Sequence, residues 1–425
     1  MKLIHTSDWH LGNQLNGNIK RTEEFDSLLD WMVGLVKSEN VEVFLIAGDI
    51  FDSVNPPTEE AVKRYYNFIG KLSRTACRHL IVIGGNHDSA LRLDAPKELY
   101  PLVAGLNICV VGGIDPKNPE REVLTLNDEN GVPEAIVCAV PYVPDKFLRT
   151  AEFGESNDEK IAKMLAGLKA HYQEVGELAE KEQARVLTEF GKTVPVIVTG
   201  HLFTKNSDKL RLRDDGVREL TLGGIHGVGL DVFPACADYV ALGHIHRPYA
   251  VDGEGRVRYS GSILPIGFDE TEYRKTVTLV EFNGGGKTNV SEVEIPLFRR
   301  MKNIAAPSRD EIFSAINRFK EECGGEPGCF KVSNTGEPIP GLYRQVLQSV
   351  EESGLICCGV VNRKNFSAPG MAPAFEDESV EDLTEIDAFN RLMEVKKIPE
   401  KERDALRNRF VGVMNEDNAA ETSRE

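Results

Sequence analysis

Five apolar segments of this chain end in a small or polar residue that is followed at once by side chains able to bind a metal. Asp8 and His10 follow KLIHTS, Asp49 follows VFLIAG, Asn86, His87 and Asp88 follow LIVIGG, His201 follows VPVIVTG, and His244 and His246 follow YVALG. In α/β sheets, the carboxyl ends of the strands are the places where sites assemble. One such ending is common, whereas five in one chain predict that these side chains meet in a single site.

The GHIH segment is the most informative of the five. Extended backbone projects residues i and i+2 to the same side, so His244 and His246 can converge on one site. This spacing alone is a weak indication of a metal, because a single buried histidine is more often a structural residue of the core. The four other endings favour the metal interpretation.

Seven of these residues are of types that bind metals: Asp8, His10, Asp49, Asn86, His201, His244 and His246. Seven donors of mixed type suggest two ions that share one carboxylate. Imidazole combined with carboxylate and amide oxygen suits Mn²⁺, Fe²⁺ or Zn²⁺ better than Ca²⁺ or Mg²⁺. Two such ions about 3.5–4 Å apart can activate water and neutralise a phosphate under in-line attack. The pattern therefore indicates phosphoester hydrolysis.

The distribution of apolar residues divides the 425-residue chain into three predicted parts. Residues 1–297 are predicted to form an α/β domain, because strand-like runs at 2–5, 41–47, 79–83, 107–111, 135–140, 194–199 and 238–242 alternate with helical patterns such as 157–190. Residues 298–370 predict a small α+β domain whose first helix begins at Ser308. Residues 371–425 start as a linker rich in Pro, Ala and acidic residues, and then carry two short amphipathic helical patterns.

The composition excludes several classes of protein. No run of about 18 apolar residues is present, so we expect no transmembrane helix, and MKLIHTSDWH turns polar at once, so we expect no secretion signal. The eight cysteines are scattered without a C-x-x-C pair, which indicates reduced thiols in a cytoplasmic protein. The formal net charge of −17 argues against a general electrostatic binder of nucleic acid. Any DNA contact must then come from local patches and from bound metal.

The segments DWH, GDIFD, GNHD, GH and GHIH resemble the five motifs of the calcineurin-like metallophosphoesterases. The resemblance implies two facing mixed β-sheets flanked by helices. It also implies that Asp8, His10 and His246 bind one metal, that Asn86, His201 and His244 bind the other, and that Asp49 bridges them. By the same resemblance, His87 is not a ligand: it stabilises the transition state and protonates the leaving oxygen, with Asp88 orienting it.

Longer strings are similar to the bacterial SbcD family within the double-strand-break repair nucleases: HTSDWHLGNQL, AGDIFDSVNPPTEEA, FPACADYVALGHIHRPY and YSGSILPIGFDE. This resemblance implies a metal-dependent nuclease that is an exonuclease on duplex ends and an endonuclease on single-stranded or hairpin DNA. The enzyme is expected to act in DNA repair and recombination. Its expected cofactor is two divalent metal ions, with Mn²⁺ as the preferred ion. It also implies a capping domain that presents DNA, and a helical tail that binds an SbcC-like SMC-type ATPase. The expected assembly contains a homodimer within a heterotetramer. Asp52, where other branches have histidine, favours the bacterial branch, and its part in proton transfer stays open.

Two other functions compete with the nuclease. One is a phosphoesterase of the same fold that acts on nucleotides or other small phosphoesters. The other is an interaction protein that has lost its metals, against which the intact ligand set argues. Two further features have an open interpretation: Lys205, Lys209, Arg211 and Arg213 either meet phosphates or form a solvated loop, and Arg247 either touches DNA or pairs with an acid. His5, His79, His171 and His226 are expected to be structural.

Overall fold

The computed structural model describes residues 1–15, 19–52, 56–149, 156–204, 227–283, 287–351 and 353–362, together with Arg403 and Leu406. The chain divides into two compact units, residues 1–364 and 365–425, and the description that follows concerns the first. Three sequence predictions lie outside the described residues. They are the basic run from Lys205 to Arg213, the structural role of His226, and the linker with nearly all of the tail.

The first sheet has six strands in the order β14-β13-β1-β4-β5-β6. Its parallel part consists of β1 (Lys2–Thr6), β4 (Val43–Ala47), β5 (His79–Ile83) and β6 (Asn107–Val111). β13 (Thr276–Asn283) and β14 (Lys287–Glu294) extend it in antiparallel register. Every residue of β4 and β5 is buried, as expected for parallel strands that are covered on both faces.

The second sheet has six strands in the order β11-β12-β10-β9-β8-β7. β8 (Pro133–Cys138), β9 (Val196–His201), β10 (Tyr239–Gly243) and β12 (Val257–Tyr259) run parallel. The short β11 (Tyr249–Ala250) and β7 (Val123–Asn127) pair antiparallel at the two edges. Both sheets are therefore mixed.

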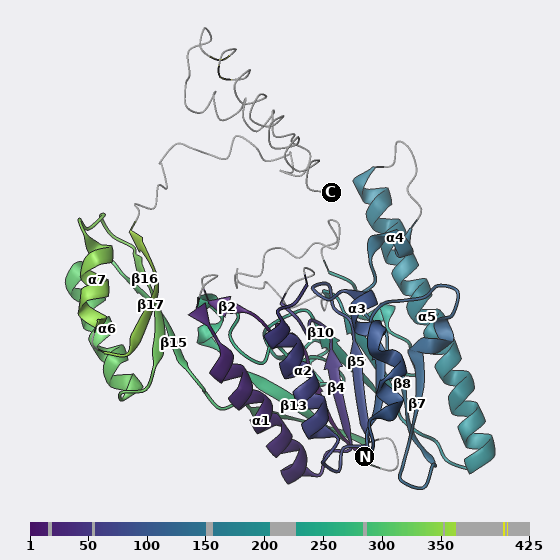
Figure 1. The fold of residues 1–425 in the computed structure, drawn as a ribbon. Coiled ribbons are helices and arrows are strands. Elements are labelled where there is room, and N and C mark those ends of the chain that lie inside the picture. Colours follow the sequence, from purple (N-terminus) through teal and green to yellow (C-terminus); the bar gives the residue numbers. More distant parts are fainter. Residues whose placement is uncertain are drawn as a thin grey trace, which may run out of the picture. The chain divides into compact units, whose positions relative to one another are not determined.

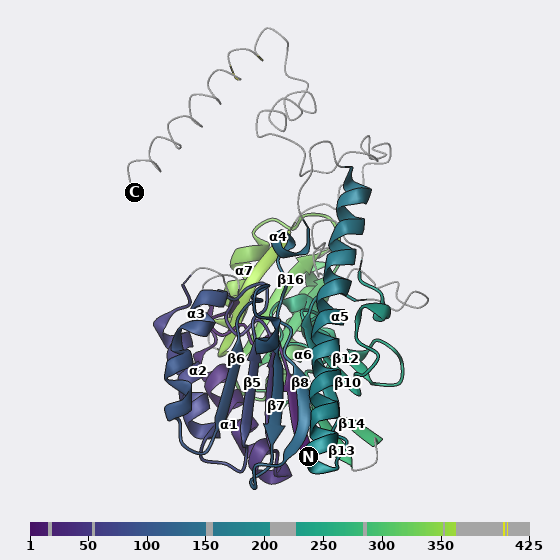
Figure 2. The ribbon, with the colours of Figure 1, turned by 90° about the vertical axis from the view of Figure 1, so that its right-hand side faces the viewer.

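The two sheets face each other and are flanked by helices, which confirms the two-sheet fold expected from the sequence. Leu3, Val43, Ile197 and Tyr239 belong to the apolar layer between the sheets. α1 (Thr22–Glu39) and α2 (Glu59–Leu72) lie on one side of the sandwich, and the long α5 (Asn157–Phe190) lies on the other (Figures 1 and 2).

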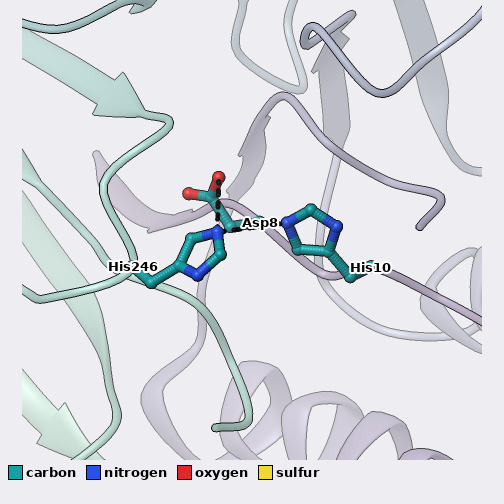
Figure 3. Close-up of side chains that lie close together, drawn as sticks. All are labelled: Asp8, His10 and His246. Atoms are coloured by element: carbon teal, nitrogen blue, oxygen red, sulfur yellow. Dashed lines mark hydrogen bonds and ion pairs between the residues drawn. The ribbon is translucent and has the colours of Figure 1, made fainter. Parts of the chain in front are cut away.

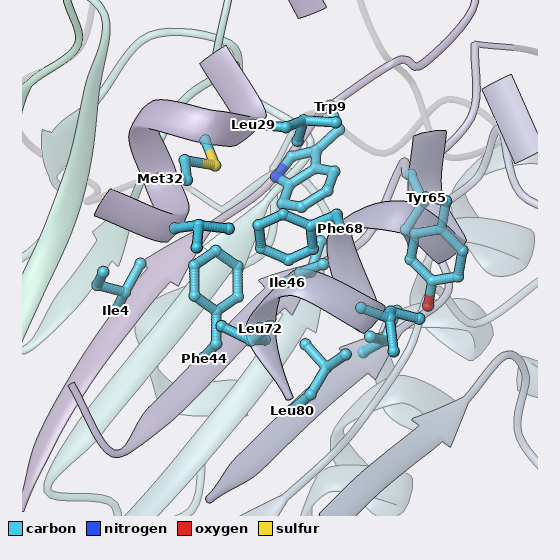
Figure 4. Packing of buried hydrophobic residues seen from close by; sticks show 14 of the residues in the cluster. Ile4, Trp9, Leu29, Met32, Phe44, Ile46, Tyr65, Phe68, Leu72 and Leu80 are labelled. Atoms are coloured by element: carbon cyan, nitrogen blue, oxygen red, sulfur yellow. The ribbon is translucent and has the colours of Figure 1, made fainter. Parts of the chain in front are cut away.

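The core under α1 and α2 is rich in aromatic side chains. Trp9, which follows β1, packs edge-on against Phe44 and Phe68, with ring centroids 6.2 and 5.0 Å apart (Figure 4). Such edge-to-face pairs stabilise a core beyond the area that they bury. Because Trp9 stands between the predicted ligands Asp8 and His10, its burial anchors the segment that carries both of them.

Residues 300–362 form a three-stranded parallel sheet, β15 (Arg300–Ala306), β16 (Gly328–Asn334) and β17 (Leu355–Asn362), connected by α6 (Arg309–Cys323) and α7 (Leu342–Val350). Phe330 and Val332 pack in one cluster with residues of both helices. Cys329 and Cys358 instead share a small cluster with Leu15 and Phe268 of the preceding part. Strand β15 was not expected from the sequence, whereas the Ser308 N-cap of α6 is present. The boundaries 298 and 370 of the capping domain stay a prediction.

The remaining described elements are short: β2 (Gln14–Leu15), β3 (Ile19–Lys20), α3 (Ala90–Asp94), α4 (Asp145–Leu148) and the 3₁₀ turns η1 (Ala95–Glu98), η2 (Tyr100–Leu102), η3 (Pro119–Glu122), η4 (Leu230–Val232) and η5 (Phe268–Glu272). Among the described residues, no helix combines the length and apolar character needed to cross a membrane. All eight cysteines are free thiols.

Candidate metal centre

The residues predicted to bind metal come together where strands of the two sheets end side by side. Two glycines permit this close approach. Gly48 has φ +90°, and a Cβ there would collide with the His201 ring. A Cβ on Gly243 would collide with the carbonyl oxygen of Ala47, which ends β4. Glycine is thus required at both positions for the ends of β4, β9 and β10 to meet.

The backbone is unusual at the same ends. Five non-glycine residues of the described chain have positive φ, and four of them are predicted ligands: Asp8, His10, Asp49 and His244. Such conformations persist only where the surrounding structure enforces them, and they concentrate at functional sites. The strain is consistent with a backbone that is shaped to aim these four side chains.

The first group of side chains consists of Asp8, His10 and His246 (Figure 3). The Nε2 atoms of His10 and His246 lie 3.2 Å apart, and His246 Nε2 is 4.0 Å from Asp8 Oδ1. The Asp8 carboxylate is itself held, because the backbone N–H of His244 donates to its two oxygens at 3.0 and 3.1 Å. One ion between these atoms would receive two imidazole nitrogens and one carboxylate.

The second group surrounds the side-chain oxygen of Asn86. His201 Nε2 and His244 Nδ1 each lie 3.0 Å from Asn86 Oδ1. Asp49 stands between the two groups, since its Oδ2 is 3.3 Å from His201 Nε2 and 3.7 Å from His10 Nε2. Asp8 and Asp49 also come close to His201 together. The structure thus brings all seven predicted ligands together, and their assignment to particular ions stays a prediction.

Two of the imidazole rings have a partner that leaves one nitrogen available to a metal. His201 Nδ1 is 2.9 Å from the carbonyl oxygen of Ala47, which can only accept, so Nδ1 carries the proton and Nε2 faces the site. His246 Nδ1 is 2.6 Å from Glu270 Oε1, which leaves its Nε2 toward Asp8 and His10. A hydrogen bond from the second ring nitrogen to a carbonyl or a carboxylate is typical of histidines that bind metals. The histidine tautomers, the mixed nitrogen and oxygen donors and the central Asp49 carboxylate therefore fit the binding of divalent metal ions.

The site is buried, and burial shifts the pKa values of its groups. Burial lowers the pKa of His10 and of His244 to about 3, so both are neutral and able to act as ligands at neutral pH. Burial also lowers the pKa of His201, but the Asp49 carboxylate beside it has the opposite and stronger effect and raises this pKa to about 9. Although burial raises the pKa of Asp49, the His201 ring holds it well below its usual range.

His87 lies next to the two groups and takes no part in either. Its backbone N–H donates to Asp49 Oδ1 at 2.8 Å, and its ring stands edge-on to His10 with centroids 5.0 Å apart. Ring nitrogen Nδ1 is 3.1 Å from the carbonyl oxygen of Asp52, so Nε2 is the ring nitrogen that does not contact this carbonyl. The side chain of Asp52 accepts from Asn13 at 3.1 Å and is 3.5 Å from His10 Nδ1.

The side chain of Asp88 forms hydrogen bonds with the backbone near His87. Its carboxylate accepts from the N–H groups of Gly85, Ile50 and Phe51 at 3.0–3.1 Å, which ties the GNHD loop to the GDIFD loop. Burial, reinforced by the charge of Asp49, raises the pKa of Asp88 to about 6. The direct partner of the His87 ring is the Asp52 carbonyl, so an orienting role of Asp88 would pass through the loop. That role stays a prediction.

Sequence reasoning missed two residues of this centre, Glu270 and Lys275. They lie 24 and 29 positions after His246, with no spacing rule that relates them to a histidine. The string SGSILPIGFDE, which contains Glu270, resembles the SbcD family but does not indicate that its acid contacts a histidine.

The three described histidines outside the motifs make ordinary structural contacts: His5 with Tyr239 and Leu242, His79 with Asn127, and His171 with Glu122. Arg247 lies over the Tyr273 ring, with its guanidinium carbon 5.7 Å from the centroid.

Comparison with known proteins gives a consistent result. Residues 1–204 match the family model described as calcineurin-like phosphoesterase. Over the whole chain, the sequence is similar to proteins named as the SbcD subunit of the nuclease SbcCD. The relative from Escherichia coli K12 is 28% identical over 98% of both chains. The relative from Rhodobacter capsulatus is 34% identical over 88% of this chain and 90% of its own, and that from Bacillus subtilis is 31% identical over 76% and 77%.

Proposed function

Because this chain belongs to the SbcD family of calcineurin-like phosphoesterases, we propose that it is a metal-dependent nuclease that hydrolyses DNA phosphodiesters. In the finer form of the proposal it is an exonuclease on duplex ends and an endonuclease on single-stranded or hairpin DNA, and it works with an SbcC-like SMC-type ATPase in cytoplasmic DNA repair and recombination.

The observation that carries this proposal is the pair of donor groups on either side of Asp49. Asp8, His10 and His246 would hold one ion, Asn86, His201 and His244 the other, and Asp49 would contribute to both. Mixed nitrogen and oxygen donors favour Mn²⁺ as the resident ion. Two such ions supply neutralisation of the phosphate charge and activation of the attacking water.

His87 provides the general acid in this proposal. The Asp52 carbonyl accepts from Nδ1–H and holds the ring in place, so that Nε2–H can be given to the leaving oxygen. The hydrogen bond from the His87 backbone to Asp49 links the position of this acid to the shared ligand. The three backbone N–H groups held by Asp88 keep the loop of His87 in place.

Two features outside the metal centre support the partners that we propose. Leu91, Leu99 and Leu102 are 86%, 63% and 77% exposed along one short segment after His87, and an exposed apolar surface favours a contact between two copies of this chain. The two amphipathic patterns in residues 376–425 are too short to be stable helices alone and favour a partner that covers them, in our proposal the ATPase. In our proposal these two contacts join the subunits as a homodimer within a heterotetramer.

A nuclease assay with and without Mn²⁺ tests the proposal. Duplex, single-stranded and hairpin DNA should each be cleaved only when the metal is present, and His87→Ala should slow cleavage of all three about 10²–10⁴-fold. Bis-p-nitrophenyl phosphate and nucleotides provide the comparison. If the protein hydrolyses these small esters in a Mn²⁺-dependent reaction but leaves every DNA untouched, the alternative phosphoesterase function is correct and the nuclease proposal is wrong.

A further inference from the structure

The geometry points to Glu270 and Lys275 as a buried pair of positioning residues that holds His246 in the orientation and tautomer that a metal ligand needs. The inference rests on the proposed function, because it takes His246 as a ligand. It concerns only one of the two donor groups, which makes it separable from the function itself.

The contacts of Glu270 use both carboxylate oxygens. Oε1 is 2.6 Å from His246 Nδ1, and Oε2 is 2.6 Å from Lys275 Nζ. Oε2 also accepts from Ser262 Oγ and from the backbone N–H of Ile266, both at 3.2 Å. With four partners, the carboxylate has little freedom to turn away from the His246 ring.

Lys275 holds the same histidine from its backbone. Its Nζ donates to the carbonyl oxygen of His246 at 3.1 Å and to Ser262 Oγ at 2.7 Å, besides its bond to Glu270. The ring and the main chain of His246 are thus tied to one rigid pair. Glu270 is 6% exposed and Lys275 7%. Because separating the two buried charges would leave each without its partner, the pair stays together.

The chemical consequence lies at the other nitrogen of the ring. A carboxylate that accepts from Nδ1–H leaves the lone pair of Nε2 facing Asp8 and His10, and it makes the imidazole a stronger donor to a metal. In the other group, His201 relies on a neutral carbonyl, that of Ala47. Loss of Glu270 should therefore weaken one ion selectively.

Calorimetric titration of the full chain with Mn²⁺ alone provides the test. Glu270→Gln should leave one ion bound with the wild-type Kd and weaken the other about 10–100-fold, the usual effect of removing an outer partner. Glu272→Gln is the matched control, because Glu272 is an exposed carboxylate of the same turn η5, and it should bind both ions as the wild type does.

A double variant separates positioning from a merely structural role. Glu270→Gln alone leaves Lys275 buried without its anion, which can harm the fold. Glu270→Gln with Lys275→Met removes both charges, and its metal-free thermal melting should return toward that of the wild type. If its second Mn²⁺ still binds about 10–100-fold more weakly, Glu270 positions His246. If wild-type affinity returns with the fold, the pair is only structural and the inference is overturned.

The wild-type titration tells the two proposals apart. A wild type that binds no Mn²⁺ would refute the proposed function and this inference with it. A wild type that binds two ions, together with a Glu270→Gln variant that binds both equally well, would refute the inference alone.

Discussion

Replacing Asp49 by asparagine tests whether the Asp49 carboxylate holds a proton on His201 that a metal ion must displace. His201 Nε2 lies 3.3 Å from Asp49 Oδ2, and its pKa is raised to about 9 in the absence of metal. At pH 7, two units lower, only about 1 ring in 100 is neutral, because each unit is a factor of ten. A metal must displace this proton, since only neutral imidazole binds it. Metal affinity should therefore rise about tenfold per pH unit from about pH 6.5 toward 9.

The Asp49→Asn substitution removes the largest effect that raises the pKa of His201. The Asp8 charge and the Ala47 carbonyl still raise this pKa and burial still lowers it, so the pKa should fall from about 9. Metal binding to the variant should therefore release fewer protons at about pH 7.5 than binding to the wild type, and its metal affinity should depend less steeply on pH. Both ions should nevertheless bind more weakly, by more than the roughly 10–100-fold that removal of an outer partner costs, because the shared ligand is lost.

Calorimetry with Mn²⁺ in two buffers that differ in ionisation enthalpy measures both quantities. At about pH 7.5 the wild type should release about one proton from His201, and the variant should release clearly fewer. Full retention of one ion at wild-type affinity by Asp49→Asn would show that Asp49 does not bridge. A variant that releases as many protons as the wild type would show that Asp49 does not hold the proton on His201.

Three further predictions concern separate parts of the chain. His87→Ala should keep both metals and lose about 10²–10⁴-fold in phosphodiester hydrolysis, measured on one preparation; loss of metal would make His87 a ligand. Deleting residues 376–425 should preserve metal content and hydrolysis of a simple phosphodiester but abolish co-purification with the ATPase. Phe389→Glu or Leu406→Glu should have the same effect. Undiminished ATPase binding would contradict the role of the tail. Leu102→Glu should convert a dimer to a monomer in sedimentation without changing metal content, and an unchanged mass would place the interface elsewhere.

Local features of the sequence were sufficient to predict much of the fold. The charged stretch 157–190 is α5, and the apolar runs at 79–83 and 107–111 are β5 and β6. The periods of buried positions and the N-cap at Ser308 are properties of neighbouring residues, so they can be read without the tertiary structure. Strand β15 was not predicted because its sequence, RMKNIAA, contains charged and polar residues and lacks a clear apolar pattern.

The seven predicted ligands of the candidate site could be named from the sequence because each follows an apolar strand, and strand ends are local features too. Its geometry was decided by tertiary structure. His246 and His10 are 236 positions apart, and only the packing of one sheet against the other brings their nitrogens to 3.2 Å. The positive φ angles at Asp8 and Asp49 depend on surroundings that no short segment contains. Glu270 and Lys275 became visible only when folding placed both beside His246, because a hydrogen bond depends on distance in space and not along the chain.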